Sequence, residues 1–191
     1  MSSLDLDWTH ALAQMAEVSR FARQESEYVQ ATVPYPGADE SALAAAEQRL
    51  GLHLDPQYRQ FLSRADGWPR WDGYQSLLGT QEMVTDKVIF DGSQATWSTI
   101  FEGLHIFLAD GGEKAWDQPH PPTEHLIPIE ATQDVFYTAA IVGSPRADAA
   151  PGPVFAFSSG GIERWQTFAH YMEHQINQWQ EVIRQSSRHQ P

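Results

Sequence analysis

Cysteine is absent from the 191-residue chain, and basic residues are scarce. Without cysteine the protein has no disulfide scaffold, no thiol nucleophile, and no cysteine-ligated zinc or iron–sulfur site. The 12 lysines and arginines face 25 aspartates and glutamates, which gives a net charge of −13. A chain this acidic repels phosphate backbones, so we expect no direct nucleic-acid binding. Its charge favours a basic protein partner instead.

Long apolar runs and targeting signals are also missing from the sequence. No apolar stretch is long enough for a transmembrane helix. The first residues contain neither the basic region nor the apolar region of a secretory signal. We therefore expect a cytoplasmic protein without a membrane partner. Apolar residues still make up 41% of the chain, with 7 Trp, 9 Phe and 6 Tyr, which is enough for a substantial core.

The negative charge is concentrated in the middle of the chain. Residues 66–134 contain 12 acidic and 3 basic residues, a net charge of −9. One interpretation is a solvated surface that keeps the protein soluble. The other is a docking face for a basic partner, and charge alone does not separate the two.

Apolar residues at helical spacing predict a first helix over residues 4–30. Residues 32–37 follow it, and there Pro34 and Pro36 flank Tyr35, which predicts a break in the helix. We interpret this stretch as a linker. The chain then divides into an N-terminal helical arm, residues 1–33, and a main domain, residues 34–191.

Two capped helices open the main domain. Asp39 is a good N-cap for a helix that Gly51 ends. Asp55 and Pro56 then start a second helix, with the aspartate as cap and the proline at the first helical position, and Asp66-Gly67 is its expected end.

Strand signals fill the middle of the sequence, and one clear helix closes it. We expect strands at 74–78, 104–109, 126–130, 135–142 and 154–157, a turn at 158–161, and ambiguous segments at 87–90 and 96–101. Thr167 caps the last helix, whose apolar face is Phe168, Met172, Ile176, Trp179 and Ile183. The order of elements predicts an α+β fold with a mixed or antiparallel sheet packed against helices.

Three stretches resemble the SUKH superfamily, the Smi/Knr-like proteins. The first runs from Pro36 to Trp68, the second from Ile106 to Gly112, and the third joins the strand at 154–157 to the helix start Thr167-Phe168. The motif residues of the first stretch are Leu50-Gly51, Tyr58-Arg59-Gln60-Phe61-Leu62, Asp55-Pro56 where the family has Leu-Pro, and Asp66-Gly67 where it has Asn-Gly. Thr167 stands in the place of the family's serine.

The resemblance implies an α+β domain with an extra N-terminal helix, and a role that is not catalytic. Many bacterial members of the superfamily are immunity proteins that neutralise a cognate toxin, often a nuclease. The founding fungal member regulates cell-wall synthesis and signalling. The chain is rich in arginine and alanine, which suits a bacterial source. We therefore expect either an immunity protein or a regulatory scaffold with an endogenous partner, and no cofactor.

One motif points to a different class of protein. His170, Glu173 and His174 spell H-x-x-E-H, the inverted metallopeptidase motif, and the two histidines share one face of a helix. That face lies opposite the apolar stripe, toward solvent, and a catalytic metal also needs a third ligand in a sheltered cleft. We keep the metallopeptidase as an alternative and expect no metal site.

The residues most suited to hold a partner lie in the acidic middle of the chain. Tryptophans together with charged residues are the types that anchor protein interfaces. Both tryptophans of the segment Trp68-Pro69-Arg70-Trp71 could tuck under the loop, but we expect at least one to be exposed. The predicted docking residues are Trp68, Trp71, Asp72, Asp110, Glu113, Trp116 and Asp117.

Overall fold

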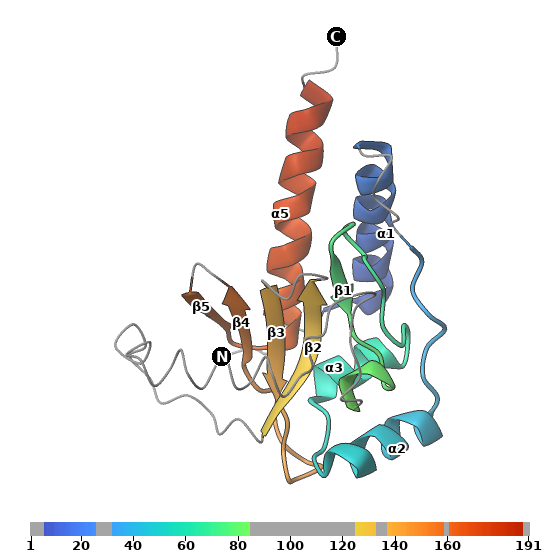
Figure 1. Cartoon of the computed structure of the whole chain (residues 1–191), viewed down its shortest axis with the longest axis vertical. Coiled ribbons are helices and arrows are strands. Elements are labelled where there is room, and N and C mark those ends of the chain that lie inside the picture. The colour runs from blue at the N-terminus through green and yellow to red at the C-terminus, as the bar shows by residue number, and fades with distance from the viewer. Residues whose placement is uncertain (1–5, 26–31, 85–124, 133–136, 159–160, 189–191) are drawn as a thin grey trace.

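The computed structural model describes residues 6–25, 32–84, 125–132, 137–158 and 161–188. In chain order the elements are α1 (Trp8–Glu25), α2 (Glu40–Leu50), α3 (Pro56–Leu62), β1 (Gln75–Leu77), the short 3-10 helix η1 (Glu82–Val84), β2 (Leu126–Thr132), β3 (Tyr137–Val142), β4 (Val154–Ser158), β5 (Gly161–Trp165) and α5 (Phe168–Arg188) (Figure 1). The predicted α+β class is confirmed. The expected strand at 104–109 and the segments at 87–90 and 96–101 lie outside the described residues.

The described strands form one antiparallel sheet in the order β1-β2-β3-β4-β5. The sequence predicts only a turn at 158–161 and no strand after it, and this is wrong. Residues 161–165 are β5, which pairs with β4 from Ser158↔Gly161 to Val154↔Trp165. β5 stands last in the strand order, and its exposed Glu163 and Arg164 hide the strand signal. Charged side chains are tolerated on such a strand and discourage further pairing.

The predicted caps of α2 and α3 are confirmed. The Asp39 side chain accepts a hydrogen bond from Ala42 N, and Gly51 ends α2 in the left-handed conformation with φ 67°. Asp55 Oδ1 accepts from Gln57 N and Tyr58 N at the start of α3, and its Oδ2 accepts from Gly152 N at 2.7 Å. This one aspartate therefore also fixes the loop before β4. The helix α3 ends at Leu62, earlier than Asp66-Gly67 predicts.

The first helix begins later than predicted, because residues 6 and 7 are not helical, and it is part of the main core. Its predicted end at residue 30 lies outside the described residues. α1 spans Trp8–Glu25, and its Trp8, Met15 and Val18 are buried with core residues of α3 and α5. The segment after it is tied down as well, since Tyr35 N donates to Gly67 O at 3.1 Å. The helix assigned to an arm thus shares its core with the domain. Of the described helices, none is long and apolar enough to cross a membrane.

The last helix, α5, supplies the centre of the core, as the sequence predicts. Its Phe168 is fully buried, and the Phe168 ring lies 5.3 Å from that of Trp8, 5.0 Å from that of Tyr58 and 5.7 Å from that of Phe61, centroid to centroid. These contacts join α1, α3 and α5. The helix runs alongside α1 and extends beyond the edge of the sheet (Figure 1).

Replacing the central ring tests this packing. We expect Phe168→Ala to lower the free energy of unfolding by about 3–5 kcal/mol, because the change removes a fully buried ring and leaves a cavity. Chemical denaturation of wild type and variant measures the difference. A loss below about 1 kcal/mol would show that Phe168 is not a core residue.

Candidate functional site

The predicted docking residues that the structure describes are buried. Trp68, Trp71 and Asp72 are 1%, 0% and 3% exposed, so the expectation that at least one tryptophan reaches the surface is wrong. Both rings belong to the main core, because the loop that carries them turns its apolar side inward. These three side chains do not offer a partner a contact surface in this conformation. The other predicted docking residues lie outside the described residues and remain a prediction: Asp110, Glu113, Trp116 and Asp117.

The loop of residues 68–74, which we call the tryptophan loop, is held at both ends by backbone hydrogen bonds. Trp68 and Leu77 exchange a pair of bonds, Trp68 N to Leu77 O at 2.8 Å and Leu77 N to Trp68 O at 3.0 Å. Trp71 N donates to Gln75 O, and the Trp68 ring N–H reaches Thr32 O at 3.1 Å. The loop is therefore a fixed extension of β1.

A carboxylate in the core lies beneath this loop. Glu130, on β2, is fully buried, and its two oxygens accept from two different elements. Oε1 accepts from the Trp71 ring N–H at 2.6 Å, and Oε2 accepts from the Tyr171 hydroxyl of α5. The Tyr171 hydroxyl lies 3.2 Å from that of Tyr137, which in turn accepts from Gln175 Nε2 at 2.8 Å. These residues, with Asp72 and Trp179, are here named the Glu130 cluster.

Burial changes the acidity of the Glu130 cluster. Removal from water, together with the charge of Asp72, raises the pKa of Glu130 to about 7, and the Tyr171 and Trp71 hydrogen bonds oppose this rise. The pKa values of Tyr171 and Tyr137 also rise, chiefly through burial. Glu130 therefore exchanges its proton near neutral pH while it is held inside the fold.

Both protonation states of Glu130 can be satisfied. The ionised carboxylate accepts from Trp71 and Tyr171. The neutral acid can instead donate to the Tyr171 oxygen, because a phenol hydroxyl both donates and accepts. Tyr171 then turns its own hydrogen toward Tyr137. The arrangement holds a proton without breaking the core, and it places no reacting groups in a cleft.

Asp72 anchors the outer part of the tryptophan loop. Its Oδ1 accepts from Tyr74 N at 2.9 Å and from Gln75 N at 2.6 Å, and its Oδ2 accepts from the Trp179 ring N–H of α5 at 3.2 Å. Burial raises the pKa of Asp72, and these hydrogen bonds oppose the rise. The loop is thus fastened to β2 through Trp71 and to α5 through Asp72.

A bulge in β2 explains how a glutamate enters the core. The register between β2 and β3 shifts between Pro128 and Glu130, which pair with Ala140 and Ala139. As a result, the neighbours Ile129 and Glu130 both contact the helix-side core instead of opposite faces. A β-bulge re-aims a side chain in this way, and strict alternation does not predict it.

Among the described residues, the H-x-x-E-H residues have no further metal ligand beside them. His170 is half-buried with Nδ1 2.9 Å from Thr167 Oγ1, while Glu173 and His174 are exposed. The ring of His174 lies against that of Trp165, 5.5 Å between centroids. Within the part of the chain that the structure describes, no group of three or more His, Cys, Asp or Glu could hold a metal ion.

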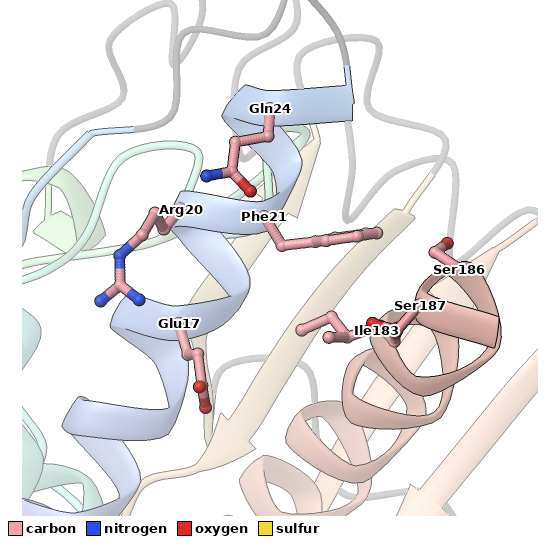
Figure 2. A pocket seen from close by; sticks show the side chains of 7 residues that line it. All are labelled: Glu17, Arg20, Phe21, Gln24, Ile183, Ser186 and Ser187. Carbon is pink, nitrogen blue, oxygen red and sulfur yellow. The ribbon is translucent and has the colours of Figure 1, made fainter. Parts of the chain in front are cut away.

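An open groove of about 490 Å³ lies between α1 and α5, away from the Glu130 cluster. Phe21 of α1 points across it toward α5, where Ile183 and Ser186 lie (Figure 2). The remaining lining is polar: Glu17, Arg20, Gln24 and Ser187. Among the described residues, no histidine lines this groove to activate its serines, so these residues alone make no nucleophilic site of that kind.

The predicted docking residues leave out two residues that the structure makes prominent, Glu130 and Tyr74. In the sequence, Glu130 has the position of a polar residue at the end of a strand. Its side chain is buried only because of the bulge, which the sequence pattern does not predict. Tyr74 stands at the start of a predicted strand, and it is 62% exposed while Trp71 is buried. A signal existed for Tyr74, since Asp72 and Gly73 before it are typical of a tight turn that would expose the next side chain.

Glu130 makes stability depend on pH. Because its pKa is raised in the folded protein, its contribution to stability is fully present below about pH 4.5 and is lost as pH rises to about 7. We expect the unfolding free energy of wild type, relative to Glu130→Gln, to fall between these values by at most about 1.4 kcal/mol per pH unit. Well above pH 7 the difference should be flat.

Glu130→Gln is the matched reference because an amide mimics the neutral acid and removes only the titration. Urea unfolding of both proteins from pH 5 to pH 8 measures the difference. A difference that does not change over this range would show that Glu130 ionises as an exposed glutamate does.

Comparison with known proteins identifies a family for this chain. Residues 37–174 match the SMI1 / KNR4 family (SUKH-1), a range that runs from just before α2 into α5 and includes the tryptophan loop and Glu130. No curated protein matches the chain. The matched segment covers well over half of the 191 residues. The antiparallel sheet, the capped helices and the family match agree, and the chain belongs to the SMI1 / KNR4 family (SUKH-1).

Proposed function

We propose that the protein is a non-catalytic immunity protein that binds a cognate toxin in the cytoplasm of a bacterium and blocks it. The observation that carries this proposal is the family match over residues 37–174, because immunity proteins are known in this family. The net charge of −13 adds to it, since a basic toxin domain is the partner that such a charge attracts.

The mechanism is stoichiometric occlusion. The acidic protein docks on the basic active-site region of the toxin, so that substrate no longer enters. Asp72 and Glu130 are buried and do not form part of the docking face. The other acidic residues of the 66–134 stretch are the ones that we propose for it, and most of them lie outside the described residues. Long-range attraction then speeds the encounter, and buried contacts slow dissociation.

Co-expression with the neighbouring gene product tests the proposal. We take the C-terminal domain encoded by the adjacent reading frame as the toxin and express it in a bacterium with and without this protein. Growth arrest that this protein relieves, together with a complex of the purified pair, is the expected result. A neighbouring protein that neither binds nor harms the cell would contradict the immunity role and favour a regulatory scaffold.

Association with the toxin should depend on salt. The Debye length falls from about 10 Å at 0.1 M to about 3 Å at 1 M, so the association rate should fall steeply over this range. Stopped-flow mixing of the two proteins at increasing sodium chloride measures the rate. An association rate that does not respond to salt would exclude steering by the acidic charge.

The H-x-x-E-H residues should be dispensable for protection. A protein with both His170→Ala and His174→Ala should relieve growth arrest as well as wild type, because we assign no metal chemistry to this pair. Metal analysis of the purified wild type serves as the second measurement. Stoichiometric zinc, or loss of protection in the double variant with folding intact, would support the metallopeptidase alternative.

A further inference from the structure

The outer side of the tryptophan loop differs from its buried side. Tyr74 is 62% exposed, although it follows shortly after Trp71 and Asp72, which are almost fully buried. Tyrosine and tryptophan are residue types that dominate binding energy at protein interfaces. A large tyrosine left in water next to two anchored residues is therefore a candidate contact.

The loop beneath Tyr74 is pinned from inside. The backbone N–H groups of Tyr74 and Gln75 both donate to Asp72, and Asp72 accepts from Trp179 on α5. Trp71 donates to Glu130 on β2. The conformational entropy of this segment is thus lost on folding and not on binding. An aromatic residue on a rigid backbone adds affinity because little entropy is lost when a partner binds it.

Backbone strain marks the same loop. Among the described residues other than glycine, Arg70 alone has a positive φ, at 46°, and its N–H donates to Ser76 Oγ at 3.0 Å. Residues with a side chain avoid this conformation because their Cβ crowds the backbone carbonyl oxygen. Gly73, with φ 98°, completes the turn. Strain of this kind persists where the surrounding structure enforces it, and it gathers at binding sites.

The net charge of the protein favours a basic partner for this loop. The Glu130 cluster contains two carboxylates, Asp72 and Glu130, and no basic side chain among its named members. Both are already counted in the net charge of −13, and Glu130 carries only part of its charge at neutral pH because burial raises its pKa to about 7. A protein surface that presents lysine or arginine around an apolar depression complements a tyrosine over buried carboxylates.

We propose that the outer side of the tryptophan loop, with Tyr74 as the main contact, is the surface that binds the basic toxin domain. This inference rests on the proposed function and names the site that performs it. Trp179 acts as a positioning residue, because its ring N–H fixes Asp72 and through it the backbone of Tyr74.

Binding kinetics of surface variants test the contact. We measure the toxin domain of the adjacent reading frame against wild type, Tyr74→Ala and the control Tyr35→Ala, whose tyrosine is 47% exposed on the segment before α2. Tyr74→Ala should raise Kd at least about 30-fold, mainly through faster dissociation. Tyr35→Ala should change Kd by less than about threefold. Equal affinity for Tyr74→Ala and wild type, or an equal loss for both tyrosines, would overturn the assignment.

A second pair of variants tests the positioning role. Trp179→Phe keeps an aromatic ring but removes the donor to Asp72, so it should lower the free energy of unfolding to some extent while the protein stays folded. In the folded variant, association should slow about tenfold. Trp165→Phe, a half-buried tryptophan on β5, is the control and should associate at the wild-type rate. An unchanged association rate for Trp179→Phe would remove the positioning role.

The outcomes separate the two proposals. If wild type binds the toxin domain and Tyr74→Ala binds equally well, the loop is not the contact while the immunity role stands. If wild type itself fails to bind or protect, both proposals fall.

Discussion

The buried carboxylate of Glu130 links elements that are far apart in the sequence. One oxygen accepts a hydrogen bond from the ring N–H of Trp71 in the tryptophan loop, and the other accepts one from the hydroxyl of Tyr171 in α5. A carboxylate without a partner in the core would be strongly destabilising, so the loop and the helix must both be in place around it. The position of the loop, and therefore that of Tyr74, follows from this requirement.

The same constraint explains why the surface of the loop is suited to binding. Trp71 and Asp72 are fixed from below, by β2 and by α5, and this leaves Tyr74 outside on a backbone that cannot easily rearrange. A partner meets a preformed contact and loses little entropy on ordering it. The groove between α1 and α5 offers no comparable set of anchored residues, although Phe21 and Ile183 make it partly apolar (Figure 2).

The caps and the apolar stripe of α5 could be predicted because they depend on local chemistry. Asp39, Asp55 and Gly51 act where their own backbone needs them, and Phe168 repeats at helical spacing with its core neighbours. The site could not be predicted in the same way. Loop tryptophans look like surface anchors until the fold supplies a core to receive them. Glu130 looks like the polar end of a strand until a bulge turns it inward.

The strand β5, which the sequence did not predict, shows the same limit of local patterns. β5 stands at the end of the strand order and carries charged residues. Such residues are tolerated there because they discourage pairing with a further strand, and their own strand propensity does not predict them. Sequence patterns therefore predicted the elements that bury an apolar face. They did not predict the elements or side chains whose role is set by distant partners.

Amide hydrogen exchange of the free protein and of its complex with the toxin domain tests the central claim most directly. We predict that the amides of Tyr74 and Gln75 exchange slowly in the free protein, because both donate to buried Asp72. We also predict that residues 69–75 gain the largest further protection in the complex. Rapid exchange of these amides in the free protein, or protection confined to the α1–α5 groove, would contradict a preformed binding loop held by the Glu130 cluster.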